Sequence, residues 1–339
     1  MSESPPAPRE NPLLIGHDEA ERQMLDALRG GRMHHAWLIT GPEGVGKATL
    51  AYRFARRLLA GTPGPSETLA LDPADPVFRR VAAGTHADLL TVEREWDEKK
   101  KRMRKAIAAE DVRAIPDFLH LTPAEGGWRV VVVDGAEDLN IHSANALLKV
   151  LEEPPPRAML LLACSAPGRL PATIRSRCRQ LRLSALTQAD MARLLALYLP
   201  ETGMAERERL AALAEGAPGR ALTLAAGDGL ALAALVGEVV DALPDMPPLR
   251  GYAVADKLGR GEDAFETFMT LLRGAIASAV RAVLRGEADA RQARLVSLRP
   301  LDAWGDVWHA LTRLQDETER FNLDKRQAVL SGLALLSGR

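Results

Sequence analysis

The fold of this chain is decided by one stretch, Val130-Val131-Val132-Val133-Asp134-Gly135-Ala136-Glu137. Four β-branched residues in a row, without polar alternation and too few for a helix, predict a strand that is buried on both faces of a parallel sheet. Ligands of open α/β sheets bind at the carboxyl ends of the strands. Asp134 is therefore expected to face a crevice that a nucleotide could fill.

The segment after this strand changes to a helical period. Apolar residues recur at intervals of three and four over residues 141–151, and the prolines at 154–156 end the predicted helix. The helix carries Asn145-Ala146-Leu147-Leu148-Lys149, and Leu151-Glu152-Glu153-Pro154-Pro155 closes it. Together with the strand, these motifs resemble the clamp-loader branch of the AAA+ ATPases, densely over residues 11–225.

The resemblance implies a fold and its division into domains. An α/β P-loop AAA+ domain with a parallel sheet is expected over residues 1–183, with residues 1–10 disordered. A small helical lid domain is expected over 184–228, and an all-α collar domain over 229–339. The helical core of the last part is predicted to include Trp304, Trp308, Leu311, Leu314, Phe321 and Leu330.

Composition bounds the class of protein. The 339 residues, 47% of them apolar, suffice for two or three domains with their own cores. Lys and Arg number 44 against 45 Asp and Glu, so no global field favours nucleic acid, and any DNA contact must be local or shared with partners. The two cysteines exclude a disulfide framework, and no apolar run reaches the length of a membrane span. We expect a soluble cytoplasmic protein without membrane contact.

A glycine-rich loop lies earlier in the chain, between a predicted strand and a predicted helix. It reads Gly41-Pro42-Glu43-Gly44-Val45-Gly46-Lys47. Glycines let backbone N–H groups face a phosphate, the helix N-terminus adds a partial positive charge, and Lys47 can reach the outer phosphates. The spacing predicts Gly41, Gly44, Gly46 and Lys47 as phosphate-binding residues.

The nucleotide site departs from that of hydrolysing AAA+ proteins at two positions, the one that holds Mg²⁺ and the one that activates water. The residue after Lys47 should be Ser or Thr to hold Mg²⁺, but it is Ala48, and the hydroxyl of Thr49 is rotated away by about 100° on a helix. In hydrolysing AAA+ proteins a glutamate that activates water follows the acid, here Asp134, but this chain has Gly135. The resemblance therefore implies an ATPase fold that does not hydrolyse ATP and binds it weakly or not at all.

An irregular insertion occupies residues 61–110. Clamp-loader relatives often carry four zinc-binding cysteines there, and this chain has none, so no zinc is expected and packing must hold the insertion. The element His86-Ala87-Asp88 remains. The basic run at 99–105 could contact phosphate, although we favour a solvated hairpin or loop balanced by nearby acids.

Three further residues receive roles only through the resemblance. Ser165 follows a buried strand at the sensor-1 position, facing the γ-phosphate; the alternative is a serine that caps the next turn. Arg177, in Ser176-Arg177-Cys178, matches the arginine finger that clamp-loader subunits present in trans to a neighbour's ATP; the alternative is an ion pair at the lid boundary. Arg220 matches the sensor-2 arginine of the lid, and equally suits a helix end.

The resemblance as a whole implies a non-motor subunit of the replicative sliding-clamp loader, within the DNA polymerase III holoenzyme. Its partners would be tau/gamma-like and delta-like sister subunits, with the sliding clamp and primed DNA reached through the complex. The main alternative is a self-sufficient AAA+ ATPase motor of the tau/gamma-like kind, which Ala48 and Gly135 disfavour. A small-molecule P-loop kinase is disfavoured because such an enzyme has no known use for the Ser176–Cys178 motif or for a helical last third of the chain.

Overall fold

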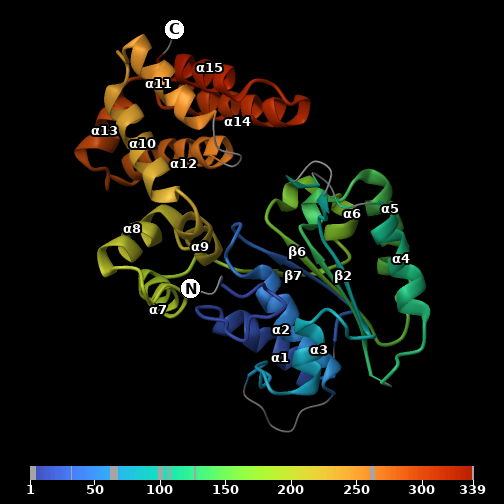
Figure 1. The fold of residues 1–339 in the computed structure, drawn as a ribbon. Helices are drawn as coiled ribbons and strands as arrows, with labels where there is room; N and C mark the ends of the chain where they lie inside the picture. The colour runs from blue at the N-terminus through green and yellow to red at the C-terminus, as the bar shows by residue number, and fades with distance from the viewer. Residues whose placement is uncertain are drawn as a thin grey trace. The chain divides into compact units, whose positions relative to one another are not determined.

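The structure, a computed structural model, describes residues 5–31, 33–61, 68–97, 102–104, 107, 109–125, 127–259 and 264–337. The chain forms two compact units, Met1–Leu222 and Thr223–Arg339 (Figure 1). The first unit holds the predicted P-loop domain and most of the predicted lid. The second holds the predicted collar.

A five-stranded sheet lies in the first unit, and all its neighbouring strands are parallel. In spatial order the strands are β2 (Leu89–Val92), β5 (Arg129–Asp134), β6 (Ala158–Cys164), β1 (Ala36–Thr40) and β7 (Arg179–Arg182). The four valines of β5 are fully buried, and β6 beside it is buried over its whole length. The α/β fold with a parallel sheet predicted from the valine run is therefore confirmed.

Helices cover both faces of this sheet (Figure 1). The apolar residues of α4 (Ala109–His120), α5 (Ile141–Glu152) and α6 (Ala172–Arg175) share one core cluster with alternate residues of β5 and β6. On the opposite face, α2 (Lys47–Leu59) packs against β1, β5 and β6. Beside α2 lie α3 (Pro76–Ala82), which packs on it, and α1 (Asp18–Arg29), which an ion pair between Glu21 and Arg53 joins to it. The lid follows β7 and contains α7 (Gln188–Tyr198), α8 (Met204–Ala214) and α9 (Pro218–Ala226).

Arg56 of α2 joins the start of the chain to the insertion. Its side chain is only 1% exposed, and it donates hydrogen bonds to the carbonyls of Arg9 (2.9 Å) and Asn11 (2.8 Å). The guanidinium also lies 4.4 Å from the ring centroid of Phe78 in α3. Residues 5–10, within the stretch expected to be disordered, therefore form a turn that is bonded to α2.

The insertion is held in part by buried apolar side chains. Leu69, Val77, Phe78 and Val81 are buried, whereas Leu71 is half-buried. Of the basic run, β4 (Arg102–Met103) pairs antiparallel with β3 (Trp96–Asp97), and Arg104 lies 2.9 Å from the carboxylate of Glu95. This part of the run matches the hairpin interpretation, and the remaining residues of the run, Lys99, Lys100, Lys101 and Lys105, lie outside the described residues.

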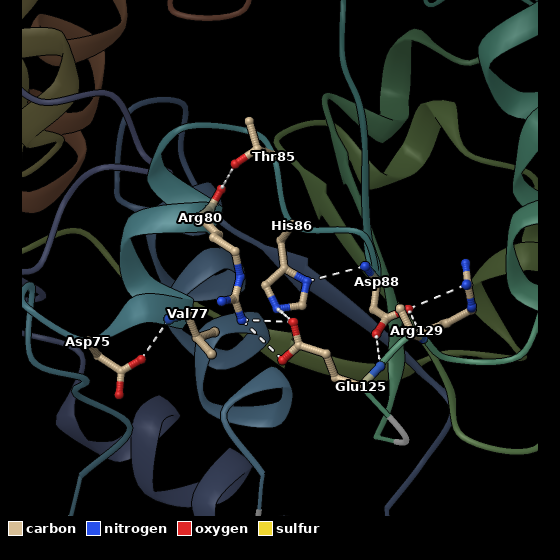
Figure 2. Close-up of polar contacts among 9 residues, drawn as sticks. Asp75, Val77, Arg80, Thr85, His86, Asp88, Glu125 and Arg129 are labelled. Carbon is tan, nitrogen blue, oxygen red and sulfur yellow. Dashed lines mark hydrogen bonds and ion pairs between the residues drawn. The ribbon is translucent and has the colours of Figure 1, made fainter.

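A buried polar cluster fixes the starts of β2 and β5 (Figure 2). Asp88, which is 1% exposed, accepts hydrogen bonds from the backbone N–H groups of Ala124 (2.9 Å) and Glu125 (3.1 Å). Its carboxylate also lies 3.3 Å from the guanidinium of Arg129. His86 accepts from the N–H of Asp88 at 3.2 Å, and burial lowers the pKa of His86. The His86–Asp88 element therefore has a structural task.

The second unit is entirely helical in its described residues. Its helices are α10 (Gly229–Ala242), α11 (Pro248–Leu258), α12 (Ala264–Arg285), α13 (Ala290–Ser297), α14 (Ala303–Phe321) and α15 (Lys325–Ser337). Trp304 and Leu311 are buried as expected, and Trp308, Leu314 and Leu330 are half-buried. Phe321 was expected in the core, but it is 62% exposed because it ends α14 just before the left-handed residue Asn322.

Helix α12 is long and apolar enough to cross a membrane by length and composition. Six of its large apolar residues are nevertheless buried within the second unit, namely Phe265, Phe268, Met269, Leu271, Leu272 and Ile276, whereas Leu284 near its C-terminus is 67% exposed. The helix packs against α10, α13 and α14. This is the pattern of a central helix in a helical bundle.

Candidate functional site

The glycine-rich loop connects β1 to α2, in the order that its sequence predicted. Gly41, Gly44 and Gly46 all have positive φ angles, of 154°, 74° and 110°, and Gly46 precedes the first turn of α2. Residues with side chains rarely adopt these angles. The loop therefore takes a conformation that depends on its glycines, at the carboxyl end of a buried strand.

The lid packs directly on this loop. The carbonyl of Gly44 accepts a hydrogen bond from the N–H of Gly219 at 2.8 Å. A Cβ atom at Gly44 would lie 2.8 Å from the backbone nitrogen of Arg220, and one at Gly41 would lie 2.5 Å from the carbonyl oxygen of Leu183. Gly44 thus allows close approach of the lid and Gly41 that of the segment just after β7, in addition to the phosphate-binding role that the sequence suggested.

A second contact holds the loop from the side of α1. The Nε2 atom of His17 lies 2.8 Å from the carbonyl oxygen of Val45, and because a carbonyl only accepts, this nitrogen must carry a proton. His17 is 6% exposed, and burial lowers its pKa, which favours the neutral ring. The structure therefore places His17 against the glycine-rich loop.

Lys47 is turned back onto the loop that precedes it. Its Nζ atom donates to the carbonyls of Gly41 (3.1 Å) and Pro42 (2.7 Å), and the residue is 7% exposed. Burial lowers the pKa of Lys47, while the charges of Glu137 and Asp134 partly oppose that shift. Two of the three ammonium donors are therefore bonded to the protein itself. Ala48 and Thr49 follow in the first turn of α2. The position where Ser or Thr would hold Mg²⁺ is therefore occupied by an alanine without a hydroxyl.

The acidic half of the site lies at the end of β5. Burial, and then the charge of Glu93, raise the pKa of Asp134 to about 6. Gly135 has a φ of 81°, and a Cβ atom there would lie 3.2 Å from a carboxylate oxygen of Asp138. A glutamate at position 135 would therefore strain the backbone as well as crowd Asp138. The backbone conformation at position 135 therefore disfavours the glutamate that hydrolysing AAA+ proteins carry there.

Glu137 is the site residue that the sequence did not single out. It lies in the 3₁₀ turn η1 (Ala136–Asp138), and its carboxylate accepts a hydrogen bond from the N–H of Ser165 at 2.9 Å. Glu137 is also the largest opposing charge on the pKa of Lys47. The structure thus brings Lys47, Asp134, Glu137 and Ser165 to the same edge of the sheet.

The cysteine beside this site is not activated. Burial, together with the charge of Glu137 and a hydrogen bond with it, raises the pKa of Cys164 to about 12. Burial also raises the pKa of Cys178 to about 12. Because the thiolate is the reactive form, both thiols are packing residues.

Arg177 contacts a different part of the first unit. It follows α6, and its Nη1 atom donates to the carbonyl of Thr173 at 3.1 Å. Its Nη2 atom lies 2.8 Å from the carboxylate of Glu152, the last residue of α5, and its side chain is 37% exposed. These contacts are with α5 and α6 and not with the glycine-rich loop. Arg220, by contrast, has its backbone against Gly44.

Within the part of the chain that the structure describes, no group of three or more His, Cys, Asp and Glu side chains could hold a metal ion. The glycine-rich loop nevertheless lies between β1 and the N-terminus of α2, in the order that phosphate binding requires.

Comparison with known proteins identifies the family. A family model described as DNA polymerase III, delta subunit, matches residues 16–187. Subunit delta' of DNA polymerase III from Pseudomonas aeruginosa is 38% identical over 58% of this chain and 58% of its own length. Subunit tau from Escherichia coli is 33% identical over 68% of this chain and 36% of its own length. The chain thus spans only 36% to 58% of these curated relatives.

Among solved structures, a gamma subunit-related protein of DNA polymerase III from Thermotoga maritima is similar, with a TM-score of 0.46 and 19% identity. The match covers 94% of this chain and 99% of that one. The residues matched by the family model include the five-stranded sheet, the glycine-rich loop and Arg177. The chain belongs to the DNA polymerase III delta subunit family, in the clamp-loader branch of the AAA+ ATPases.

Proposed function

We propose that this chain is a non-motor subunit of the sliding-clamp loader of DNA polymerase III and that Arg177 acts on the ATP of a neighbouring subunit. The observation that carries the proposal is the state of its own nucleotide site. Lys47 is bonded to the loop carbonyls, Ala48 has no hydroxyl for Mg²⁺, and position 135 has a backbone conformation that suits glycine. Arg177, in turn, contacts α5 and α6 and not the glycine-rich loop.

The proposed partners are tau/gamma-like and delta-like sister subunits, with the sliding clamp and primed DNA reached through the complex. The proposed location is the cytoplasm. Mixing the purified chain with these two kinds of subunit is expected to give one complex, whose mass includes this chain. A chain that remains separate under all mixing ratios would contradict the proposal.

A motor of the tau/gamma-like kind is the second candidate, because a tau subunit is 33% identical over 68% of this chain. A motor needs a hydroxyl that holds Mg²⁺ and an acid that activates water. Ala48 and Gly135 supply neither. Glu137 is the acid nearest to this role, but its carboxylate is bonded to the backbone of Ser165.

The isolated chain is therefore expected to hydrolyse no ATP above background. Residual nucleotide binding is expected to be feeble, because the Mg²⁺ ligand is missing and Lys47 must first exchange its bonds to Gly41 and Pro42. Phosphate release should be measured for the unmodified chain and for Lys47→Ala. Turnover that disappears in the variant, or tight Mg²⁺-dependent ATP binding by calorimetry, would show that the site is functional.

We also propose that the chain folds without zinc. Cys164 and Cys178 are both buried, and they belong to β6 and to the segment before β7, away from the insertion. Metal analysis of the purified chain is expected to show no stoichiometric zinc, and chelation is expected to leave its circular dichroism unchanged. One zinc per chain, lost together with folded structure on chelation, would contradict this prediction.

A further inference from the structure

The guanidinium of Arg177 is held from two directions. Its Nη1 atom donates to the carbonyl of Thr173 at 3.1 Å, and its Nη2 atom lies 2.8 Å from the carboxylate of Glu152. Thr173 belongs to α6, and Glu152 is the last residue of α5. Two independent elements of the fold thus fix the position of one partly exposed arginine.

Stability alone gives little reason for this arrangement. The side chains of Arg177 and Glu152 are 37% and 51% exposed, and ion pairs of that exposure contribute little to folding. A carboxylate at the C-terminus of a helix is also disfavoured by the helix dipole. Glu152 therefore occupies a position that is electrostatically unfavourable for its own helix.

The contacts leave Arg177 able to bind an anion. A guanidinium has five N–H donors in one plane, of which Nη1 donates one to Thr173, while Nη2 lies in ion-pair contact with Glu152. The remaining donors can meet phosphate oxygens in the bridging geometry that arginine offers. Holding a long side chain in one orientation before it binds also reduces the entropy that binding costs.

We propose that Glu152 is a positioning residue, which orients Arg177 toward the outer phosphate of the nucleotide bound by the neighbouring subunit. This inference rests on the proposed function, since it requires Arg177 to act in trans. Glu152 itself does not touch the nucleotide. Its carboxylate fixes one edge of the guanidinium so that the other edge faces the partner.

The test uses the complete complex on primed DNA, with ATP turnover measured as kcat and KM. Glu152→Gln removes the charge and keeps the shape. We expect it to lower kcat by at least about half of the loss that Arg177→Ala causes, with KM unchanged, because orientation acts on the transition state. Glu152→Asp, which keeps the charge, is expected to lie between Glu152→Gln and the unmodified chain.

Glu153→Gln is the matched control, because it removes the adjacent carboxylate, whereas Arg177 pairs with Glu152. It is expected to leave kcat unchanged. The double variant Glu152→Gln with Arg177→Ala is expected to match Arg177→Ala alone, because the carboxylate acts only through the arginine. Melting curves of each variant chain control for folding.

The outcomes separate this inference from the proposed function. If Arg177→Ala lowers kcat but Glu152→Gln does not, the positioning role is wrong and the proposed function stands. If Glu152→Gln lowers kcat equally with and without Arg177, Glu152 acts by another route and the inference is wrong. If Arg177→Ala itself leaves kcat unchanged, both are wrong.

Discussion

A complex that carries Arg177→Ala in this chain is expected to assemble normally and to lose ATP turnover at one of its sites. Arginine fingers contribute about 10³–10⁵-fold in rate, on the order of 4–7 kcal/mol of transition-state stabilisation. Total turnover should fall by a smaller fraction, because the other sites of a clamp loader keep their own fingers. Both DNA-stimulated ATP hydrolysis and clamp loading should be measured.

Arg177→Lys supplies the control for charge. Lysine keeps the positive charge but offers one point charge in place of the planar fork, so this variant is expected to remain defective. A variant complex that loads clamps at the unmutated rate would exclude the finger role. A variant chain that melts early or fails to join the complex would instead show that Arg177 serves the fold.

The replacement Asp88→Ala is expected to lower the free energy of unfolding of the first unit by about 3 kcal/mol, near the lower end of the effect of breaking a buried ion pair. Asp88 accepts from two backbone N–H groups and faces Arg129, and all of these would lose their acceptor. The expected loss of unfolding free energy is near the lower end of that range because Arg129 keeps two other partners, the carbonyls of Phe118 (3.1 Å) and Thr122 (2.8 Å). Urea unfolding followed by circular dichroism measures the change.

Asp75→Ala is the matched control for this prediction (Figure 2). Asp75 caps α3 by accepting from the N–H of Val77 at 2.7 Å, and it is half-buried with no ion pair in the part of the chain that the structure describes. Loss of such a cap costs about 1 kcal/mol. Equal destabilisation by the two replacements would contradict the structural role assigned to Asp88.

The sequence predicted those features that depend on local pattern. Val130–Val133 predicted a buried parallel strand, and the spacing of Gly41, Gly44 and Gly46 predicted a loop between a strand and a helix. The motif at 145–149 lies on a helix, as its period indicated. In each case the information lies within one element and its immediate flanks.

Features that depend on distant contacts were not predictable. The bond between Glu137 and Ser165 requires the left-handed backbone of Gly135 and the neighbouring position of β6. Arg56 is buried because it bonds the carbonyls of Arg9 and Asn11, which no periodicity connects to α2. The pairing of Arg177 with Glu152 likewise depends on how α5 packs beside α6.

The central claim is that this chain contributes to ATP turnover through its neighbours and not through its own loop. The most direct test measures ATP turnover on primed DNA for this chain alone, for the tau/gamma-like and delta-like sister subunits alone, and for all of them together. We expect background turnover from this chain alone and higher turnover from the full set than from the sister subunits. Turnover by the isolated chain at the rate of the full set, or no change when the chain is added to the sister subunits, would contradict the claim.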